Sequence, residues 1–135
     1  MLRKRNSPVR LLLVRHGITR LHTGDRFWGS TDIALSNAGI KQAGQLRNRL
    51  SQEKLSAIYS SPLRRARSTA EIIAAGHKVE VTPCDDLCEC NFGYIEGLTF
   101  EEIKQLADGN KAFVEYMKKR RPDLVTRALE LHGKK

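Results

Sequence analysis

The sequence predicts an α/β fold, a three-layer sandwich whose mostly parallel sheet carries helices on both faces. Short apolar segments alternate with segments of helical periodicity through the first part of the chain, an order typical of right-handed βαβ units. The chain has 135 residues, of which 40% are hydrophobic and 29% charged, which is enough for one core of ordinary size. We therefore expect a single domain over residues 1–135.

Three segments are predicted to be strands: residues 9–14 (VRLLLV), 55–60 (LSAIYS) and 78–81 (KVEV). The first two are continuous apolar runs, short enough for strands that are buried on both faces of a parallel sheet. In such a sheet the ligand site lies beyond the carboxyl ends of the strands. The residues that directly follow the first two strands are therefore the candidates for chemistry.

Five helices are expected, over residues 36–50, 61–76, 99–108, 112–120 and 124–131. Ser36 and Ser61 are placed as N-caps of the first two helices, since a serine hydroxyl accepts a hydrogen bond from the first helical turn. Thr99 and Glu102 have the spacing of a capping box at the start of the third helix. These helices are expected to cover the sheet.

Composition limits the kinds of partner. The formal net charge of +9, from 24 Lys and Arg against 15 Asp and Glu, predicts a positive field that attracts anions. No aromatic, zinc or helix-turn-helix pattern accompanies this charge, so no nucleic-acid partner is expected. No apolar run approaches the roughly 18 residues of a membrane helix, and the N-terminal residues lack a signal-peptide cleavage site, so a cytoplasmic location without membrane contact is expected.

The spacing of the three cysteines fits neither a zinc site nor a redox pair. Cys84, Cys88 and Cys90 are therefore expected to be free thiols, and no metal or cofactor is expected.

Two groups of residues follow the first two predicted strands. Arg15, His16 and Gly17 follow the first strand, and a neutral imidazole nitrogen there is a competent nucleophile toward phosphorus. Gly17 is expected to permit a strained turn, and Arg15 to hold phosphoryl oxygens. After the second strand, the arginines of residues 60–71 (SSPLRRARSTAE) meet a helix N-terminus, where Arg65 is expected to bind phosphate. Arg64 and Arg67 are expected to face solvent.

Four motifs occur in one order along the chain: LLLVRHG, RFWGSTDIALSNAGIKQA, SPLRRARSTAE and LCECNFGYIEGLTFEEI. Together they resemble the histidine phosphatase superfamily, which includes phosphoglycerate mutases and small bacterial phosphatases such as α-ribazole phosphatase. The resemblance implies that His16 is the nucleophile, that Arg15 and Arg65 bind phosphate, and that Glu89 donates a proton to the leaving oxygen. It implies hydrolysis of a small phosphorylated metabolite, such as α-ribazole 5'-phosphate, through a phosphohistidine intermediate.

Further residues of these motifs are candidates for substrate binding, each with a structural alternative. His22 is placed to donate a hydrogen bond to phosphate, or is a loop histidine without a catalytic part. Trp28, followed by Gly29, is placed to stack on the organic part of a substrate, or is a half-buried loop tryptophan. Glu89 has its own alternative, a loop carboxylate that pairs with an arginine. A carboxylic acid needs burial to stay neutral and act as a donor.

The chain departs from the resemblance at two places. Ile18 follows Gly17 where relatives carry Glu, and the second catalytic histidine of the relatives has no counterpart except His132, in a segment of helical pattern. The expectation is an incomplete member that lacks its last strand or strands and has weak activity. The alternatives are a catalytically impaired domain that binds phospholigands and a mutase-like phosphoryl transferase. An incomplete sheet edge also predicts a homo-oligomer.

Overall fold

The computed structural model describes residues 9–21, 26–109 and 111–120. The chain forms two compact units, the first made of Met1–Leu21 and Asp32–Glu89 and the second of His22–Thr31 and Cys90–Lys135. Each unit has its own internal packing, and the single domain expected from the sequence stays a prediction. Within the described ranges, no helix is both long and apolar enough to cross a membrane.

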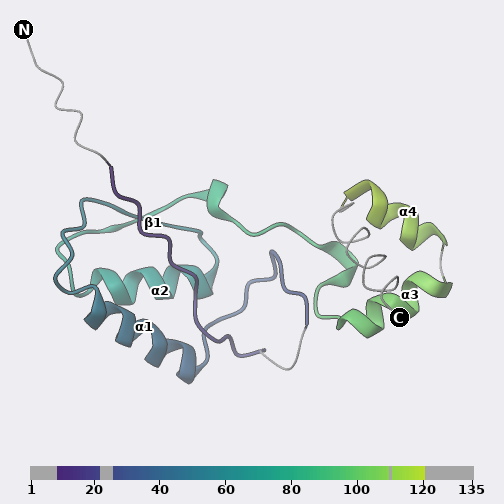
Figure 1. Ribbon diagram of the computed structural model, residues 1–135, viewed down its shortest axis with the longest axis horizontal. Helices are drawn as coiled ribbons and strands as arrows, with labels where there is room; N and C mark the ends of the chain where they lie inside the picture. The colour runs from purple at the N-terminus through teal and green to yellow at the C-terminus, as the bar shows by residue number, and fades with distance from the viewer. Residues whose placement is uncertain (1–8, 22–25, 110, 121–135) are drawn as a thin grey trace, which may run out of the picture. The chain divides into compact units, whose positions relative to one another are not determined.

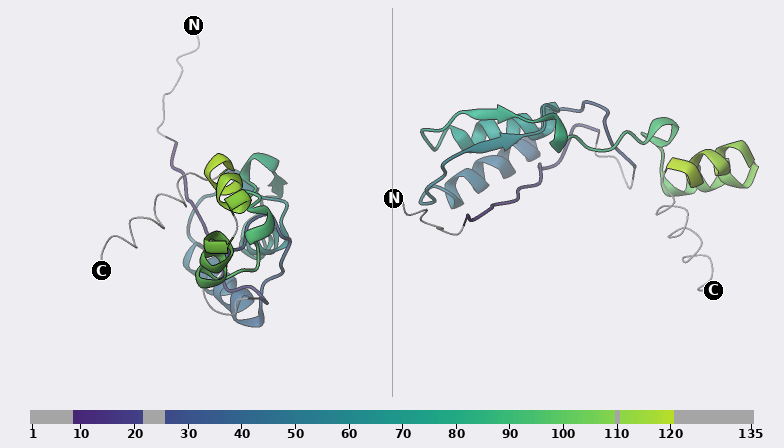
Figure 2. Two further views of the ribbon diagram at one scale, coloured as in Figure 1. Left: turned by 90° about the vertical axis from the view of Figure 1, so that its right-hand side faces the viewer. Right: turned by 90° about the horizontal axis from the view of Figure 1, so that it is seen from above.

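The first unit contains a two-stranded parallel sheet. Strand β1 (Ile58–Ser60) pairs with β2 (Val81–Pro83), and α2 (Arg64–Ala74) connects them. Helix α2 packs against both strands, and α1 (Asn37–Arg49) packs against α2 (Figure 1, Figure 2). The predicted parallel βαβ unit is therefore confirmed, while the full three-layer sandwich stays a prediction.

Alanine, isoleucine and leucine side chains make the core of the described part of this unit. The buried apolar residues of the unit are Ile33, Leu35, Ala43, Ala70 and Ile73. Full burial of an isoleucine or leucine side chain stabilises the fold by roughly 1.5–3 kcal/mol, so these few residues hold the two helices and the short sheet together.

The two helices of the first unit begin differently. Helix α1 starts as predicted, because the Ser36 hydroxyl oxygen accepts a hydrogen bond of 3.1 Å from the Gly39 N–H. Helix α2 starts two residues later than residue 62, and its N-cap is Leu63 rather than Ser61. The Ser61 hydroxyl instead accepts from the Leu63 N–H at 3.2 Å, and Asp32 accepts from the Arg64 N–H at 2.7 Å. A carboxylate distant in sequence thus satisfies the helix end.

The predicted strand at residues 9–14 is wrong. The structure assigns no strand to these residues, and their apolar side chains are exposed rather than buried on both faces. A strand exists only where a neighbour pairs with its backbone. In the part of the chain that the structure describes, β1 pairs only with β2, so this segment lacks that neighbour. Strand β1 is also shorter than predicted, and the third strand lies at Val81–Pro83 rather than at residues 78–81.

The second unit joins a loop to two helices, α3 (Phe100–Gly109) and α4 (Lys111–Arg120). The predicted capping box at the start of α3 is confirmed, because the Glu102 carboxylate accepts from the Thr99 N–H at 2.7 Å and the Thr99 hydroxyl accepts from the Glu102 N–H at 3.2 Å. The helix predicted at residues 124–131 lies outside the described residues.

One carboxylate holds the loops of the second unit together. Glu96 accepts backbone N–H groups from Ser30 at 2.9 Å, Thr31 at 2.9 Å and Phe92 at 3.0 Å, and it also accepts from the hydroxyls of Ser30 and Thr31. Burial raises the pKa of Glu96, but the hydrogen bonds from Thr31, Phe92 and Ser30 outweigh it and hold the pKa below its usual range. The backbone at residues 30 and 31 and at residue 92, far apart in sequence, is thus held by hydrogen bonds to the Glu96 carboxylate.

We predict that Glu96→Gln lowers the free energy of unfolding by about 2 kcal/mol, since hydrogen bonds to a charged group contribute roughly 1.5–3 kcal/mol and this group is only partly buried. The amide nitrogen would face the N–H donors of Thr31 or Phe92. Trp28, the single tryptophan, lies in the same unit, so urea unfolding followed by its fluorescence measures the effect. Glu101→Gln, at an exposed residue of α3, is the control. Equal stability of the two variants would contradict the role of Glu96.

Candidate active site

The turn that carries His16 lies against helix α1. The Ile18 N–H donates to the Gln42 side-chain oxygen at 3.0 Å, and the Ile18 carbonyl oxygen accepts from the N–H and the hydroxyl of Ser36, at 2.9 and 3.0 Å. Both backbone polar groups of Ile18 are therefore satisfied by α1 and its N-cap. The position of the neighbouring His16 backbone follows from this contact.

Two glycines permit this close approach. A Cβ atom on Gly39 would clash with the Ile18 carbonyl oxygen, and a Cβ atom on Gly17 would lie 2.6 Å from the Gln42 side-chain oxygen. The strained turn expected at Gly17 is not found, because the glycines with positive φ among the described residues are Gly93 and Gly97. Gly17 is thus needed for space next to α1 and not for an unusual backbone angle.

The imidazole of His16 is held in one tautomer. Its Nδ1 lies 2.8 Å from the Gly17 carbonyl oxygen, which only accepts hydrogen bonds, so Nδ1 carries the proton in the neutral ring. The lone pair of the neutral ring is then on Nε2. Burial lowers the pKa of His16, the hydrogen bond to Gly17 raises it, the charges of Arg65 and Arg15 lower it, and Glu89 raises it. The net direction is down from 6.5, which favours the neutral ring at neutral pH.

Arg65 is the buried cation of this site. It lies in the first turn of α2, its exposed fraction is 4%, and its charge acts on His16. Arg64 and Arg67 are exposed as expected, and Arg67 pairs with Glu71 at 2.8 Å one helical turn away. Arg15 is exposed, and its charge also acts on His16. The charges of two guanidinium groups thus act on one imidazole within the first unit.

Glu89 acts electrostatically on His16 but is exposed. The burial on which its donor role was argued is therefore not found. The segment just before Glu89 is fixed by Cys88, whose sulfur accepts from the Ser61 hydroxyl at 3.7 Å. The three cysteines are free thiols, as expected.

The predicted substrate-binding residues lie elsewhere in the chain. His22 lies outside the described residues, and Trp28 and Gly29 belong to the second unit. Trp28 is half-buried, and its ring lies against Gly97, where a Cβ atom would approach it to 3.2 Å. Gly29 is buried close to the Cys90 backbone. The role of these three residues in substrate binding stays a prediction.

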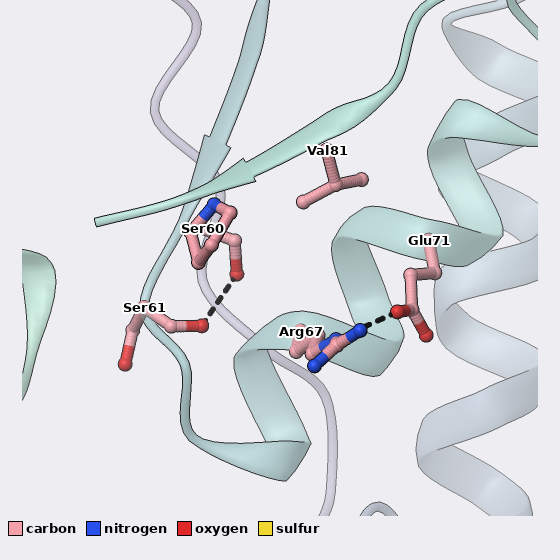
Figure 3. A pocket seen from close by; sticks show the side chains of 6 residues that line it. Ser60, Ser61, Arg67, Glu71 and Val81 are labelled. Atoms are coloured by element: carbon pink, nitrogen blue, oxygen red, sulfur yellow. Dashed lines mark hydrogen bonds and ion pairs between the residues drawn. The ribbon is translucent and has the colours of Figure 1, made fainter. Parts of the chain in front are cut away.

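A hollow in the first unit lies between α2 and the strands (Figure 3). It is lined by Ser60, Ser61, Arg67, Glu71, Val81 and Pro83. The ion pair between Arg67 and Glu71 already neutralises its charged side chains. None of His16, Arg15, Arg65 or Glu89 lines this hollow, so it is separate from the candidate site. Among the described residues, no group of three side chains is placed to hold a metal ion.

Two structural residues of the site were missed in the sequence. Gln42 holds the turn after His16, and Asp32 accepts from the first N–H of α2, which carries Arg65. Their partners are 24 and 32 residues away, so no local spacing signals either contact. Both residues lie within the RFWGSTDIALSNAGIKQA motif, and membership of this motif is the signal in the sequence that could have pointed to them.

Comparisons with known proteins agree on one family. The model of the histidine phosphatase superfamily, branch 1, matches residues 11–129. Phosphoserine phosphatase 1 of Hydrogenobacter thermophilus is 40% identical over 97 residues, which are 72% of this chain and 46% of that protein. The mycobacterial glucosyl-3-phosphoglycerate phosphatase Rv2419c, solved with VO3, is 32% identical with a TM-score of 0.63 over 76% of this chain and 48% of that one.

A second similar structure shows the fold alone. A putative α-ribazole-5'-P phosphatase from Escherichia coli has a TM-score of 0.67 at 24% identity, over 76% of this chain and 50% of that one. The chain spans about half or less of the length of the relatives that it matches.

We predict that His16 titrates below 6.5 and that Arg65→Met raises its pKa, because the substitution removes a nearby positive charge. The Cε1–H resonance of His16, assigned by its loss in His16→Gln, reports this pKa by NMR. Arg67→Met, on the same helix but ion-paired with Glu71, is the control and leaves the pKa unchanged.

The lowered pKa of His16 also makes the free energy of unfolding depend on pH. The folded state binds fewer protons than the unfolded state at pH values just below 6.5, so the contribution of His16 to stability falls as the pH is lowered through this range. A His16 pKa at or above 6.5 would contradict the buried, doubly cationic surroundings described above.

Proposed function

Because this chain belongs to branch 1 of the histidine phosphatase superfamily, we propose that it hydrolyses a small phosphomonoester through a phosphohistidine on His16. The observation that carries the proposal is the tautomer of His16, with Nδ1 bound to the Gly17 carbonyl and the lone pair on Nε2. Relatives that are named as phosphatases support the reaction class. The proposal assumes the three-layer sheet expected from the sequence.

In the first step, the Nε2 lone pair attacks phosphorus and the bond from phosphorus to the alcohol oxygen breaks. The lowered pKa of His16 keeps this lone pair available at neutral pH, since a protonated ring has none. The product is a phosphoryl group on Nε2 and a free alcohol. The proton stays on Nδ1 and is donated to the Gly17 carbonyl oxygen, and this hydrogen bond stabilises the positive charge of the phosphorylated ring.

Arg65 and Arg15 are proposed to bind the phosphoryl oxygens. A guanidinium group presents paired N–H donors that match two oxygens of a phosphate. The buried position of Arg65 fixes its side chain before substrate arrives, which reduces reorganisation in the transition state. The exposed Arg15 adds a second positive charge that acts on His16.

Glu89 is proposed to give its proton to the departing alcohol oxygen. A water molecule then attacks phosphorus, the bond to Nε2 breaks, and the carboxylate of Glu89 takes the proton that the water loses. Phosphate leaves and both side chains return to their starting states.

The substrate is proposed to be a small phosphorylated metabolite. Relatives are named for phosphoserine, glucosyl-3-phosphoglycerate and α-ribazole 5'-phosphate, which share a phosphate ester of a polar alcohol. His22, Trp28 and Gly29 are proposed to contact the phosphate and the alcohol part.

The exposure of Glu89 favours a second candidate function, a domain that binds phosphate esters and turns them over poorly. A carboxyl group that acts as a general acid is usually shielded from water, and the side chain of Glu89 is exposed. In this case the arginines still bind the ligand.

We predict that His16 becomes phosphorylated when the protein is mixed with phosphoserine or p-nitrophenyl phosphate. Mass spectrometry after a basic quench detects the acid-labile group on His16, and His16→Gln abolishes it. His77→Gln, at a histidine outside the site, is the control and keeps the label. Stoichiometric binding of the esters without any label would support the binding domain instead.

We further predict that Glu89→Gln slows phosphoryl transfer from phosphoserine by roughly a hundredfold, the lower end of general acid catalysis. Transfer from p-nitrophenyl phosphate changes little, because its leaving group needs no proton. Pre-steady-state rates of alcohol release measure both. An equal loss with the two substrates would show that Glu89 has no part in protonating the leaving oxygen.

A further inference from the structure

One peptide group joins Gly17 to Ile18, and both of its polar atoms are hydrogen-bonded to side chains. The carbonyl oxygen of Gly17 lies 2.8 Å from Nδ1 of His16, and the N–H of Ile18 donates to Oε1 of Gln42 at 3.0 Å. A trans peptide group is planar, so its carbonyl and its N–H point in opposite directions. The bond to Gln42 on α1 therefore sets the direction in which the Gly17 carbonyl faces His16.

The next peptide group along the chain is held separately. The Ile18 carbonyl oxygen accepts from the N–H of Ser36 at 2.9 Å and from its hydroxyl at 3.0 Å. A rotation of the peptide group between Gly17 and Ile18 leaves these two bonds in place. Glycine resists such a rotation less than other residues, because it has no Cβ atom. The bond from the Ile18 N–H to Gln42 is thus the contact that opposes the rotation.

We propose that Gln42 is a positioning residue, which selects the Nδ1–H tautomer of His16 through the peptide group of Gly17 and Ile18. A carbonyl oxygen only accepts hydrogen bonds, so a carbonyl that faces Nδ1 stabilises the proton there and leaves the lone pair on Nε2. If the carbonyl turned away, Nδ1 would lose this acceptor, and the proton would lie on Nε2 in a larger share of the molecules.

The three groups form one chain of hydrogen bonds from His16 to α1. Nδ1–H donates to the Gly17 carbonyl and the N–H of the same peptide group donates to Gln42, so each bond polarises the peptide group in the direction that strengthens the other. The Gln42 oxygen also lies close to Gly17, where an added Cβ atom would approach it to 2.6 Å. The role therefore depends on one acceptor oxygen, which glutamate also offers and which leucine and alanine lack.

NMR of the chain labelled with ¹⁵N-histidine tests the proposal, because a ring nitrogen that carries a proton resonates far upfield of one that does not. At a pH well above the pKa of the ring, we expect Nδ1–H to predominate at His16. In Gln42→Leu and Gln42→Ala, the ratio of Nδ1–H to Nε2–H falls roughly threefold or more, the effect of losing one ordinary hydrogen bond. Gln42→Glu does not lower the ratio.

Two controls separate this role from a general loosening of the turn. Gln45→Leu, at another glutamine of α1, leaves the ratio unchanged. Ser36→Ala removes the hydroxyl that bonds the Ile18 carbonyl and caps α1, so it lowers the free energy of unfolding but also leaves the ratio unchanged. Circular dichroism checks that each variant folds. Nε2–H predominating in the unmodified chain, an unchanged ratio in Gln42→Leu and Gln42→Ala, or an equal fall in Ser36→Ala would overturn the proposal.

The consequence for phosphoryl transfer rests on the proposed function. Fewer rings with a lone pair on Nε2 mean that p-nitrophenyl phosphate labels His16 more slowly in Gln42→Leu, at least in proportion to the fall in the Nδ1–H fraction. A measurable fall in this fraction with an unchanged labelling rate would contradict that consequence. Absence of label in the unmodified chain would contradict the proposed function instead, and the nitrogen spectra would still decide the role of Gln42.

Discussion

The candidate site depends on one close contact, the backbone of residues 17 and 18 against the start of α1. A Cβ atom at Gly39 would clash with the Ile18 carbonyl oxygen, one at Gly17 would press on the Gln42 side chain and the Gly39 backbone, and the polar groups of Ile18 find partners in Ser36 and Gln42. This contact fixes the backbone on which the imidazole of His16 turns back to the Gly17 carbonyl. The orientation of His16 is therefore a consequence of helix packing, and a larger residue at Gly39 would disturb both the packing and this orientation.

The charges around His16 have two effects in the same direction. Arg65 and Arg15 disfavour a protonated imidazole, which favours the neutral ring, and in the proposed function the same guanidinium groups would attract an anionic phosphate ester. Bringing the anion between them offsets their mutual repulsion. The cost of burying Arg65 at 4% exposure is thus part of the arrangement that would bind phosphate.

The elements that follow from local chemistry could be predicted from the sequence. The hydroxyl of Ser36 and the capping box of Thr99 and Glu102 act within one helical turn, so their patterns identify α1 and α3 directly. The parallel pairing of β1 and β2 follows from the helix between them. The sequence could not show whether residues 9–14 form a strand, because an apolar run indicates that a segment can pair with another strand but not that a neighbouring strand is present. Contacts of Gln42, Asp32 and Glu96 also depend on distant residues.

The proposed reaction has a side that attacks phosphorus, at His16, and a side that protonates the leaving group, at Glu89. The two residues differ in burial, because the first depends on local contacts and the second on shielding from water. The nucleophile side needs only contacts within α1, α2 and one turn, all of which form in the first unit. The leaving-group side needs a carboxyl group shielded from water, and shielding requires chain packed over Glu89 rather than a local contact. Residues 9–14 have the same requirement, since a strand needs a neighbour. Among the described residues, Glu89 and residues 9–14 are exposed, whereas His16 is half-buried and held by its contact with Gly17.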